Sequence, residues 1–556
     1  MDKDTSTLPP AQAAPQKKTS VIKNAGVISA CILLSRILGF IRDVLISGFF
    51  GKALDAFVFA FQIPNLFRKL FGEGALSAAF IPTLSHYLNE KPYAETIRFI
   101  NIMITLLFGF LSLIAGLVIL TTFALPALFP SFMAAQGFSE LFLKLLRIMI
   151  PYLPLVCVVA LLQAVLNSLK HFMMPALASV VLNICWIGGF LVADKIGTSD
   201  ENKVAIMAWS ILVGGVMEIA IQIPILLKKK ITFKPIIDFK HPGLKEVLTL
   251  MLPTVFGLAV FQVNLFMDSI IAKAFIKDAG ALSALYLGNR LMQFPFALIG
   301  ISLATALFPY LAELAAKKDY SGMMSELSKA LRIVLFVGIP ASLGLMILAE
   351  LIVHWSFFTL PTALFPKRVV DINAIARTTN VLIFYSLGIW SYGAVQIINR
   401  AFYSLKDMKT PVKIGIYTVI ANVVLNIALV FPFKESGIAL ATTISSIMNL
   451  AILLYVLNRK ANRLTSAAAP PMSLLGSLAK QSILPLICSL LMCAICLAGL
   501  RYIPKYDSLI GDTIKTLSLV TVGALSYLGF SYLIQHKSIK EIIFGRHSGK
   551  TSTNPK

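Results

Sequence analysis

Long apolar segments follow one another along the chain from residue 22 to residue 535, with short polar connections between them. An α-helix needs roughly 20 residues to cross the hydrocarbon core of a bilayer, and most of these segments are at least that long. The pattern predicts fourteen membrane-spanning helices, at about 22–48, 54–88, 99–125, 141–167, 175–193, 204–227, 246–275, 281–315, 333–355, 373–402, 414–432, 437–457, 477–500 and 512–535. We therefore expect an all-α polytopic membrane protein.

The composition supports this fold class and excludes an ordinary soluble protein. The 556 residues are 57% hydrophobic and only 13% charged, with a mean hydropathy of +0.82, whereas soluble domains are about a quarter charged residues. The connections leave no room for a soluble catalytic domain, and the chain has no P-loop, HExxH, GxSxG or Cys/His nucleophile pattern. We expect no enzyme activity and no cofactor. The six cysteines lie in apolar segments without metal-ligand spacing, which favours core packing.

The formal net charge of +23 is distributed unevenly between the two sides of the predicted membrane. If residues 1–20 are cytoplasmic, the inner segments hold 27 Lys and Arg residues and the outer connections hold nine. The positive-inside rule predicts such an excess on the cytoplasmic side. It therefore places both termini in the cytoplasm, and it explains the basic loops better than nucleic-acid binding does.

A short internal repeat indicates two similar halves. "SLKHFMMP" (168–175) and "SLKDMKTP" (404–411) lie 236 residues apart on inner loops, and "LNI" follows both, at 182–184 and 425–427. Six helices between equivalent loops imply two parallel six-helix lobes, an architecture of transporters. We expect a disordered cytoplasmic tail at 1–20, an N-terminal lobe at 21–236, a C-terminal lobe at 237–464, an additional helix pair at 465–535 and a basic cytoplasmic tail at 536–556.

The first predicted helix carries charged residues in its membrane-spanning part. At 100° per residue, Ser35, Arg36, Gly39, Arg42 and Asp43 share an arc of about 120°. An Arg at the centre of a membrane helix costs roughly 2.5–3.5 kcal/mol, and Arg36 lies roughly 21 Å from the start of the helix, too deep to reach an interface readily. A structural ion pair with Asp43 would satisfy only one arginine. The stripe therefore favours an anion-binding role for the other.

The second predicted helix adds polar residues around Pro64, at Asp55, Asn65, Arg68, Lys69 and Glu73. Asn65, Lys69 and Glu73 form an i, i+4, i+8 row, in which Lys69 and Glu73 pair and leave Arg68 for a ligand. The alternative is that Arg68 and Lys69 mark the inner interface, and the sequence does not decide between the two.

The eighth predicted helix places Arg290 beside Asn289, Gln293 and the helix-breaking Pro295. Four arginines from three helices would thus outnumber the acids that pair with them locally. Because the guanidinium group suits bidentate phosphate contacts, this set predicts a cavity for an anionic headgroup or solute.

A different site is expected in the second half of the chain. Asp268 lies in the middle of a predicted helix, Asn422 and Asn426 are one turn apart on another, and Thr442 begins a third. Oxygen ligands suit a hard cation such as Na⁺, and Asp268 alone would serve as a proton carrier. The alternative is that these side chains only hydrogen-bond the helices to one another.

Four sequence blocks resemble the MurJ (MviN) family of lipid II flippases, within the multidrug/oligosaccharidyl-lipid/polysaccharide exporter superfamily. They are "SRILGFIRD" (35–43), "DAFVFAFQIPNLFRKLFGEGALSAAFIP" (55–82), "NRLMQFPFALIGISLATALFP" (289–309) and "AFYSLKDMKTPVKI" (401–414). The resemblance implies two six-helix lobes and a C-terminal helix pair that forms a groove for a lipid tail.

The resemblance also implies roles for particular residues. Substrate-binding residues would be Arg36, Arg42, Arg68, Arg290, Ser35 and Asn65, with charge partners or gating residues Asp43, Asp55, Glu73 and Gln293. Some members carry acids where this chain has Asn289 and Gln293, and an Asp at the second Asn of the cation site. A gating role that needs a carboxylate at 289 or 293 is therefore in doubt.

The expected function is a lipid II flippase of the bacterial inner membrane that works by alternating access, driven by the membrane potential with Na⁺ or H⁺ as a coupling ion. Its partners would be lipid II, an undecaprenyl-diphosphate-linked disaccharide-peptide, and membrane lipids. We expect a monomer, alone or with cell-wall synthesis or division proteins. The alternatives are a flippase for another polyprenyl-diphosphate-linked glycan and a cation-coupled drug exporter.

Overall fold

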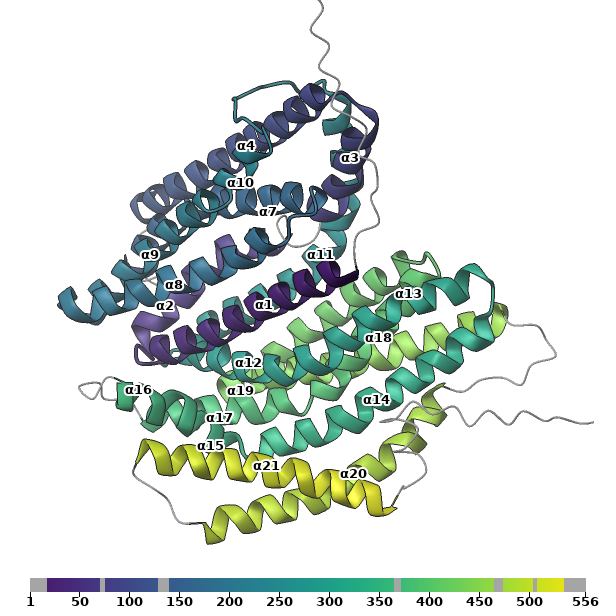
Figure 1. Ribbon diagram of the computed structural model, residues 1–556. Coiled ribbons are helices and arrows are strands. Elements are labelled where there is room, and N and C mark those ends of the chain that lie inside the picture. Colours follow the sequence, from purple (N-terminus) through teal and green to yellow (C-terminus); the bar gives the residue numbers. More distant parts are fainter. Residues whose placement is uncertain are drawn as a thin grey trace, which may run out of the picture. The chain divides into compact units, whose positions relative to one another are not determined.

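The computed structural model describes residues 18–70, 76–128, 140–364, 372–464, 474–503 and 508–534, and these contain helices and no strands. The predicted all-α fold is therefore confirmed. The helices labelled in Figure 1 and those between them are α1 (Lys18–Ser47), α2 (Lys52–Phe67), α3 (Leu76–Glu90), α4 (Tyr93–Leu128), α6 (Glu140–Met149), α7 (Tyr152–Ser168), α8 (Met173–Ile196), α9 (Asp200–Ala220), α10 (Ile223–Lys228), α11 (Pro242–Phe275), α12 (Ala281–Phe296), η2 (Ala297–Ile301), α13 (Ser302–Ala316), α14 (Tyr320–Ile347), α15 (Ala349–His354), η3 (Trp355–Thr359), α16 (Leu360–Leu364), α17 (Ile372–Ser386), α18 (Ile389–Ser404), α19 (Lys409–Leu464), α20 (Leu474–Tyr502) and α21 (Leu509–Ile534).

Eight helices of the described part are long and apolar enough to cross a membrane, or nine if α17 and α18, bent by 44°, form one span. The chain is therefore a multi-pass membrane protein, but this count does not confirm the predicted fourteen spans. The difference has two physical causes. The predicted span 281–315 is divided into α12, η2 and α13. The two predicted spans 414–432 and 437–457 form the single helix α19, which is kinked at Lys434 (φ 51°, ψ −134°). At 1.5 Å per residue the 56 residues of α19 would measure about 84 Å, far more than one bilayer crossing.

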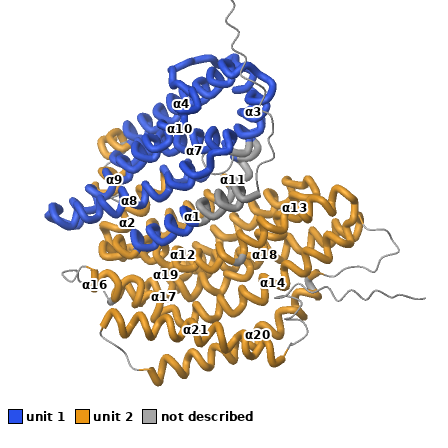
Figure 2. The backbone as a smooth tube through the Cα atoms, in the orientation of Figure 1, with its two compact units in different colours: residues 1–43, 64–121, 147–255 blue, residues 44–63, 122–146, 256–556 orange. Residues whose placement is uncertain are grey.

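The chain divides into two compact units (Figure 2). Unit 1 contains residues 1–43, 64–121 and 147–255, and unit 2 contains residues 44–63, 122–146 and 256–556. The predicted lobes follow the order of the chain, whereas these units exchange short segments, so the predicted lobe boundaries stay predictions. The two predicted terminal tails fall almost wholly outside the described residues.

The core of unit 2 is a layer of apolar side chains shared by α13, α14, α18 and α19. Met323, Leu327, Val334, Ile397 and Leu457 are essentially inaccessible to solvent there. Between membrane helices such a layer is stabilised by close van der Waals packing rather than by removal of side chains from water, and it holds α13, α14, α18 and α19 together in unit 2.

The C-terminal pair α20 and α21 packs on this layer. Helix α20 lies along α14, and the two helices of the pair lie against each other (Figure 1). Cys488, Cys493 and Cys496 are buried in the apolar cluster that joins them to α14. The prediction that these cysteines pack in a core is therefore confirmed.

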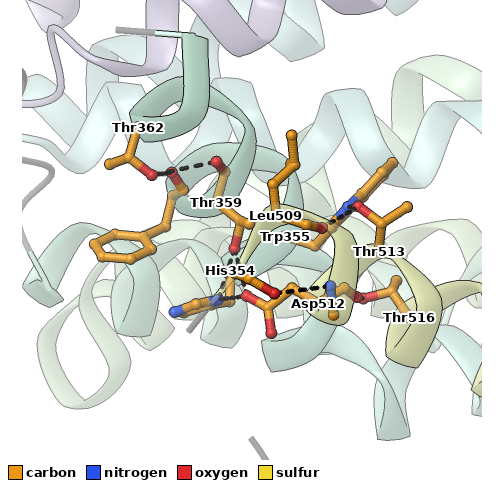
Figure 3. Close-up of polar contacts among 11 residues, drawn as sticks. His354, Trp355, Thr359, Thr362, Leu509, Asp512, Thr513 and Thr516 are labelled. Atoms are coloured by element: carbon orange, nitrogen blue, oxygen red, sulfur yellow. Dashed lines mark hydrogen bonds and ion pairs between the residues drawn. The ribbon is translucent and has the colours of Figure 1, made fainter. Parts of the chain in front are cut away.

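Polar contacts anchor the first turn of α21 to the π-helical segment η3 (Figure 3). The Thr359 hydroxyl donates to the Asp512 carboxylate at 2.7 Å, and His354 Nδ1 lies 3.6 Å from the same carboxylate. The Trp355 indole N–H donates to Thr513 at 2.9 Å. Asp512 is buried, so its hydrogen bonds fix where α21 begins.

Four helices end on a lysine in the left-handed conformation. Lys170, Lys230, Lys318 and Lys406 follow α7, α10, α13 and α18 with φ between 56° and 59°. At Lys170 and Lys406 the backbone N–H groups of the lysine and of the next residue bond back into the last helical turn in the same way. Lys230 and Lys318, with the residues after them, bond back in the same way, so the four helices share one kind of ending.

Candidate functional site

The polar stripe predicted on α1 is completed by two residues of α8. Arg42 donates from Nε and Nη2 to the Asp43 carboxylate at 3.1 and 2.8 Å, and from Nη1 to Asn183 Oδ1 at 3.1 Å. Its guanidinium carbon lies 4.3 Å from the centre of the Trp186 ring. The Asn183 amide in turn donates to the Ser35 carbonyl and hydroxyl at 3.1 and 3.3 Å. Arg42 is thus held on three sides, and the fully buried Asp43 balances its charge.

Arg36 differs from Arg42 although both lie on the same helix. Its side chain is exposed, and within the described residues it makes no hydrogen bond or ion pair. A guanidinium in this state has all five N–H donors available. Of the two arginines on α1, Arg36 therefore offers the uncompensated positive charge.

Asn183 and Trp186 were not recognised as site residues from the sequence. A signal for Asn183 existed, because the "LNI" repeat aligns Asn183 with Asn426, which belongs to the predicted cation site. Trp186 gave no comparable signal, because an aromatic residue in an apolar helix usually packs in the core.

Arg68 lies in a second polar group of unit 1. Its Nε donates to Asn65 Oδ1 at 2.9 Å, one helical turn away, and its charge interacts electrostatically with Glu218 of α9. Glu218 is buried and lies 3.4 Å from the Tyr152 hydroxyl. Arg68 therefore has a buried acidic neighbour that the sequence analysis missed, although an acid inside an apolar helix was a visible signal. Glu73, the predicted partner of Lys69, lies outside the described residues.

Asp55 fixes the start of α12. Its carboxylate accepts hydrogen bonds from the Gly280 N–H at 2.6 Å, the Ser283 N–H at 2.7 Å and the Ser283 hydroxyl at 2.6 Å. These two N–H groups belong to the first turn, which has no intrahelical acceptors for them. A residue of α2 thus acts as a helix cap for α12, and the described hydrogen bonds of Asp55 go to that turn.

Arg290 lies on α12 in unit 2, whereas Arg36, Arg42 and Arg68 belong to unit 1. Near Arg290, the Gln293 amide donates to Asn289 on the same face of the helix. Positions 289 and 293 therefore carry two neutral amides that bond to each other, and neither supplies the carboxylate that a gating role would need.

The four residues of the predicted cation site meet in the interior of unit 2. The Asn426 amide donates to Asp268 Oδ1 at 2.6 Å and to Asn422 Oδ1 at 2.9 Å, and the Thr442 hydroxyl donates to Asp268 Oδ2 at 3.2 Å. Rotating the Asn422 amide brings it within hydrogen-bonding distance of Asp268 and of Asn264. Asp268, Asn422 and Asn426 are buried and Thr442 is half-buried, and the group consists of oxygen-bearing side chains from α11 and both parts of α19.

Two features of this group would suit a small cation. Asn426 Oδ1 is buried and has no hydrogen-bond partner, so an acceptor is left unused. Asp268 has no Lys or Arg partner among the described residues. A buried, unpaired carboxylate is costly, and a monovalent cation or a proton would neutralise it.

An apolar cavity lies beside the C-terminal pair in unit 2. It measures about 440 Å³ and is lined by residues of α14, α18, α19 and α20, among them Leu335, Leu343, Trp390, Leu454 and Leu486. Its lining can accommodate a hydrocarbon chain.

Comparisons with known proteins agree over most of the chain. The model of a family described as lipid II flippase MurJ matches residues 46–509. The probable lipid II flippase MurJ of Vibrio cholerae serotype O1 is 33% identical over 443 residues, which cover 78% of this chain and 82% of that protein. The lipid II flippase MurJ of Burkholderia cenocepacia is 32% identical over 449 residues, with coverage of 78% and 83%.

Solved structures give the same result. A lipid II flippase MurJ in an inward closed conformation superimposes with a TM-score of 0.70 at 27% identity, covering 92% of this chain and 99% of that one. An inward-facing multidrug resistance MATE transporter of the MOP superfamily superimposes with a TM-score of 0.60 at 14% identity, covering 80% of this chain and all of the other. At this identity the second match shows a shared fold only.

Proposed function

The chain belongs to the lipid II flippase MurJ family, and on that premise we propose that it moves lipid II from the cytoplasmic to the periplasmic leaflet of the bacterial inner membrane. No covalent bond is made or broken in this step, so the protein acts as a transporter. Both termini lie in the cytoplasm and the protein works as a monomer. The observation that carries the proposal is the arginine-bearing wall formed by α1 and α8, in a family whose members are named for a diphosphate-linked lipid.

Arg36 and Arg42 have different tasks in this proposal. Arg36 binds the diphosphate, because its guanidinium is open to a ligand and suits bidentate phosphate contacts. Arg42, already engaged by Asp43 and Asn183, orients the wall and adds a donor without adding net charge. In unit 1, Arg68 contributes a further cationic group, and Ser35 and Asn65 provide neutral hydrogen-bonding groups. Arg290 of unit 2 stays a predicted substrate-binding residue. Alternating access exposes the headgroup to each side in turn.

The undecaprenyl tail stays in an apolar environment during transport. The 440 Å³ cavity beside α20 supports this assignment, because its lining is made largely of Leu, Ile and Trp side chains. The tail would leave the membrane interior only at a cost of about 0.8 kcal/mol per exposed CH₂ group.

The inward step is coupled to a cation or a proton at Asp268. Asp268, Asn422, Asn426 and Thr442 would hold Na⁺, which would supply the positive charge that the buried carboxylate lacks. The protein contributes the arrangement of these four side chains across α11 and α19. Neutralising the Asp268 carboxylate would draw the two helices together.

The test is complementation of a bacterial strain depleted of its own flippase, together with an assay of lipid II accessibility at the outer face. Arg36→Ala should abolish both, Arg36→Lys should restore part of the activity, and Arg501→Ala, at the exposed end of α20, should have no effect. Normal growth and lipid II exposure with inserted Arg36→Ala would overturn the proposal. Native mass spectrometry with competing lipid-linked precursors distinguishes lipid II from another polyprenyl-diphosphate glycan, since preferential binding of the latter would reject the assignment.

A further inference from the structure

Unit 1 contains a second cavity, which the proposed transport mechanism does not use. It measures about 660 Å³ and lies between α4 and the connection from α10 to α11. Its walls are mostly apolar: Phe108, Phe110 and Leu113 come from α4, and Phe233, Ile237 and Phe239 come from the connection. Five of these six side chains are more than 40% exposed, so the cavity opens to the surroundings of the protein.

The connection at 231–238 is an extended segment bound to α4. Asn101 donates from its amide to the Thr232 carbonyl at 2.9 Å and accepts from the Lys234 N–H at 3.2 Å. The Thr105 hydroxyl accepts from the Ile236 N–H at 3.1 Å. An extended backbone at the edge of a membrane needs such partners, because lipid offers none. Two polar residues of α4, Asn101 and Thr105, therefore bind the backbone of this segment and hold it against the helix above the cavity.

The same connection is strongly basic. Residues 228–245 include six lysines and one acid, Asp238, which pairs with Arg98 at 3.1 Å. None of the six lysines has an acidic partner among the described residues. One of them, Lys234, lines the cavity. This connection lies on the side that the positive-inside rule assigns to the cytoplasm.

We propose that this cavity binds an anionic diacyl phospholipid of the inner leaflet, with one acyl chain between α4 and the 231–238 segment and the phosphate at Lys234 and its neighbouring lysines. Charge complementarity selects the ligand, because a zwitterionic lipid fills the apolar walls equally well but gains little from the lysines, whereas each lysine near an anionic membrane surface contributes to binding. A water-soluble acidic peptide would not cover Phe110 and Leu113, which lie in the apolar run of α4. The site uses no residue of the α1–α8 wall, so it does not depend on the proposed function.

The test measures lipid preference at one position of the cavity. Phe110→Trp introduces a fluorophore into its wall, and Leu120→Trp places one on an exposed part of the same helix away from it. Each variant is reconstituted with brominated phosphatidylglycerol or brominated phosphatidylcholine, and the quenching of the parent protein's four tryptophans is subtracted. We expect the quenching association constant at position 110 to be about fivefold higher for the anionic lipid, and at position 120 to be nearly equal for the two lipids.

Charge variants then locate the headgroup. In the Phe110→Trp protein, Lys234→Gln combined with Lys240→Gln should lower the preference for the anionic lipid to the value measured at position 120. Lys409→Gln with Lys413→Gln, which removes the same charge from another inner connection, should leave it unchanged. Thermal unfolding shows that each variant is folded. The proposal would be overturned by an equal lipid preference at positions 110 and 120 or by equal effects of the two lysine pairs. It would also be overturned if neither lipid quenched the tryptophan at position 110, because a protein segment would then cover the cavity.

Discussion

At the scale of single residues, two arginines six positions apart on α1 have opposite surroundings. Arg42 is bound by a buried carboxylate, an amide and an indole ring, whereas Arg36 has no partner among the described residues. A charge that is already paired inside a protein changes little when a ligand arrives, whereas an unpaired one gains the full interaction. The polar stripe thus divides into an orienting part and a binding part.

Asn183 bonds to both Arg42 and Ser35, and its replacement tests whether this connection matters. Asn183→Leu preserves the size of the side chain but removes hydrogen bonds to Arg42 and Ser35. A hydrogen bond to a charged group contributes about 1.5–3 kcal/mol, so we expect outer-face lipid II exposure to slow at least tenfold. The matched control Asn89→Leu, at an exposed position near the end of α3, should transport normally. Full activity of Asn183→Leu would show that the α8 contact is dispensable.

Asp268 provides a test of the coupling ion that does not depend on transport. If the site holds Na⁺, saturating NaCl should raise the free energy of unfolding relative to choline chloride, by about 2.7 kcal/mol at one hundred times the dissociation constant. Asp268→Asn lacks the charge that attracts the cation, so its thermal unfolding should not respond to Na⁺. Equal responses of the two proteins to Na⁺ would exclude this site as the cause.

At the scale of elements, the helices are bounded by contacts of two kinds. Some ends are determined locally, as at the four lysines with left-handed φ, where the chain reverses into a polar loop. Others depend on distant residues, as at α12, whose first turn is capped by Asp55, and at α21, whose first turn contacts η3. Such distant contacts position elements relative to one another within unit 2.

Substitutions of Lys406 test whether a helix end is determined by the backbone conformation of its own last residues. A side chain in the left-handed region costs roughly 1–2 kcal/mol, mainly for residues branched at Cβ, and glycine avoids this cost. Lys406→Gly should therefore raise the free energy of unfolding by about 1 kcal/mol or less, because glycine's greater freedom in the unfolded chain offsets part of the relief, and Lys406→Val should lower it. The control is Lys409→Val, in the first turn of α19. Thermal unfolding in detergent measures the effect, and a Val variant as stable as the Gly variant would rule out backbone strain at this position.

The sequence predicts some of these elements better than others, for a physical reason. The stripe on α1 follows from helical periodicity alone, and the structure pairs Arg42 with Asp43, whereas Arg36 lies exposed on the same helix. Asp268, Asn422, Asn426 and Thr442 were grouped by their chemistry, and the structure brings them into contact. In contrast, the bonds from Asp55 to α12 join residues more than 220 positions apart. No local pattern encodes such a contact, and Asp55 was expected to balance arginines.

At the scale of the whole molecule, the two units do not follow the order of the chain. Residues 1–43, which include most of α1, belong to unit 1. Residues 44–63, which include the end of α1 and most of α2, belong to unit 2. The cap that Asp55 provides for α12 is one reason why this segment is part of unit 2.

The orientation of the molecule is tested at the two ends of α11. In the predicted topology Lys245, near the start of the helix, faces the cytoplasm, and Lys277, just after its end, faces the periplasm. In intact cells a membrane-impermeant thiol reagent should label Lys277→Cys and should label Lys245→Cys only after lysis. The native cysteines, all in helices, give the background in the parent protein. Labelling of Lys245→Cys in intact cells would reverse the assigned topology.

The four lysines at helix ends have a consequence for how the chain encodes its membrane orientation. Each one ends a helix by its backbone conformation. In the predicted topology its side chain also counts toward the positive charge on the cytoplasmic side. A single residue would thus determine both where the helix ends and on which side of the membrane that end lies. Lys406→Asn would separate them, since asparagine tolerates the same backbone geometry but carries no charge. The chain would then fold the turn correctly while losing part of the signal that orients it.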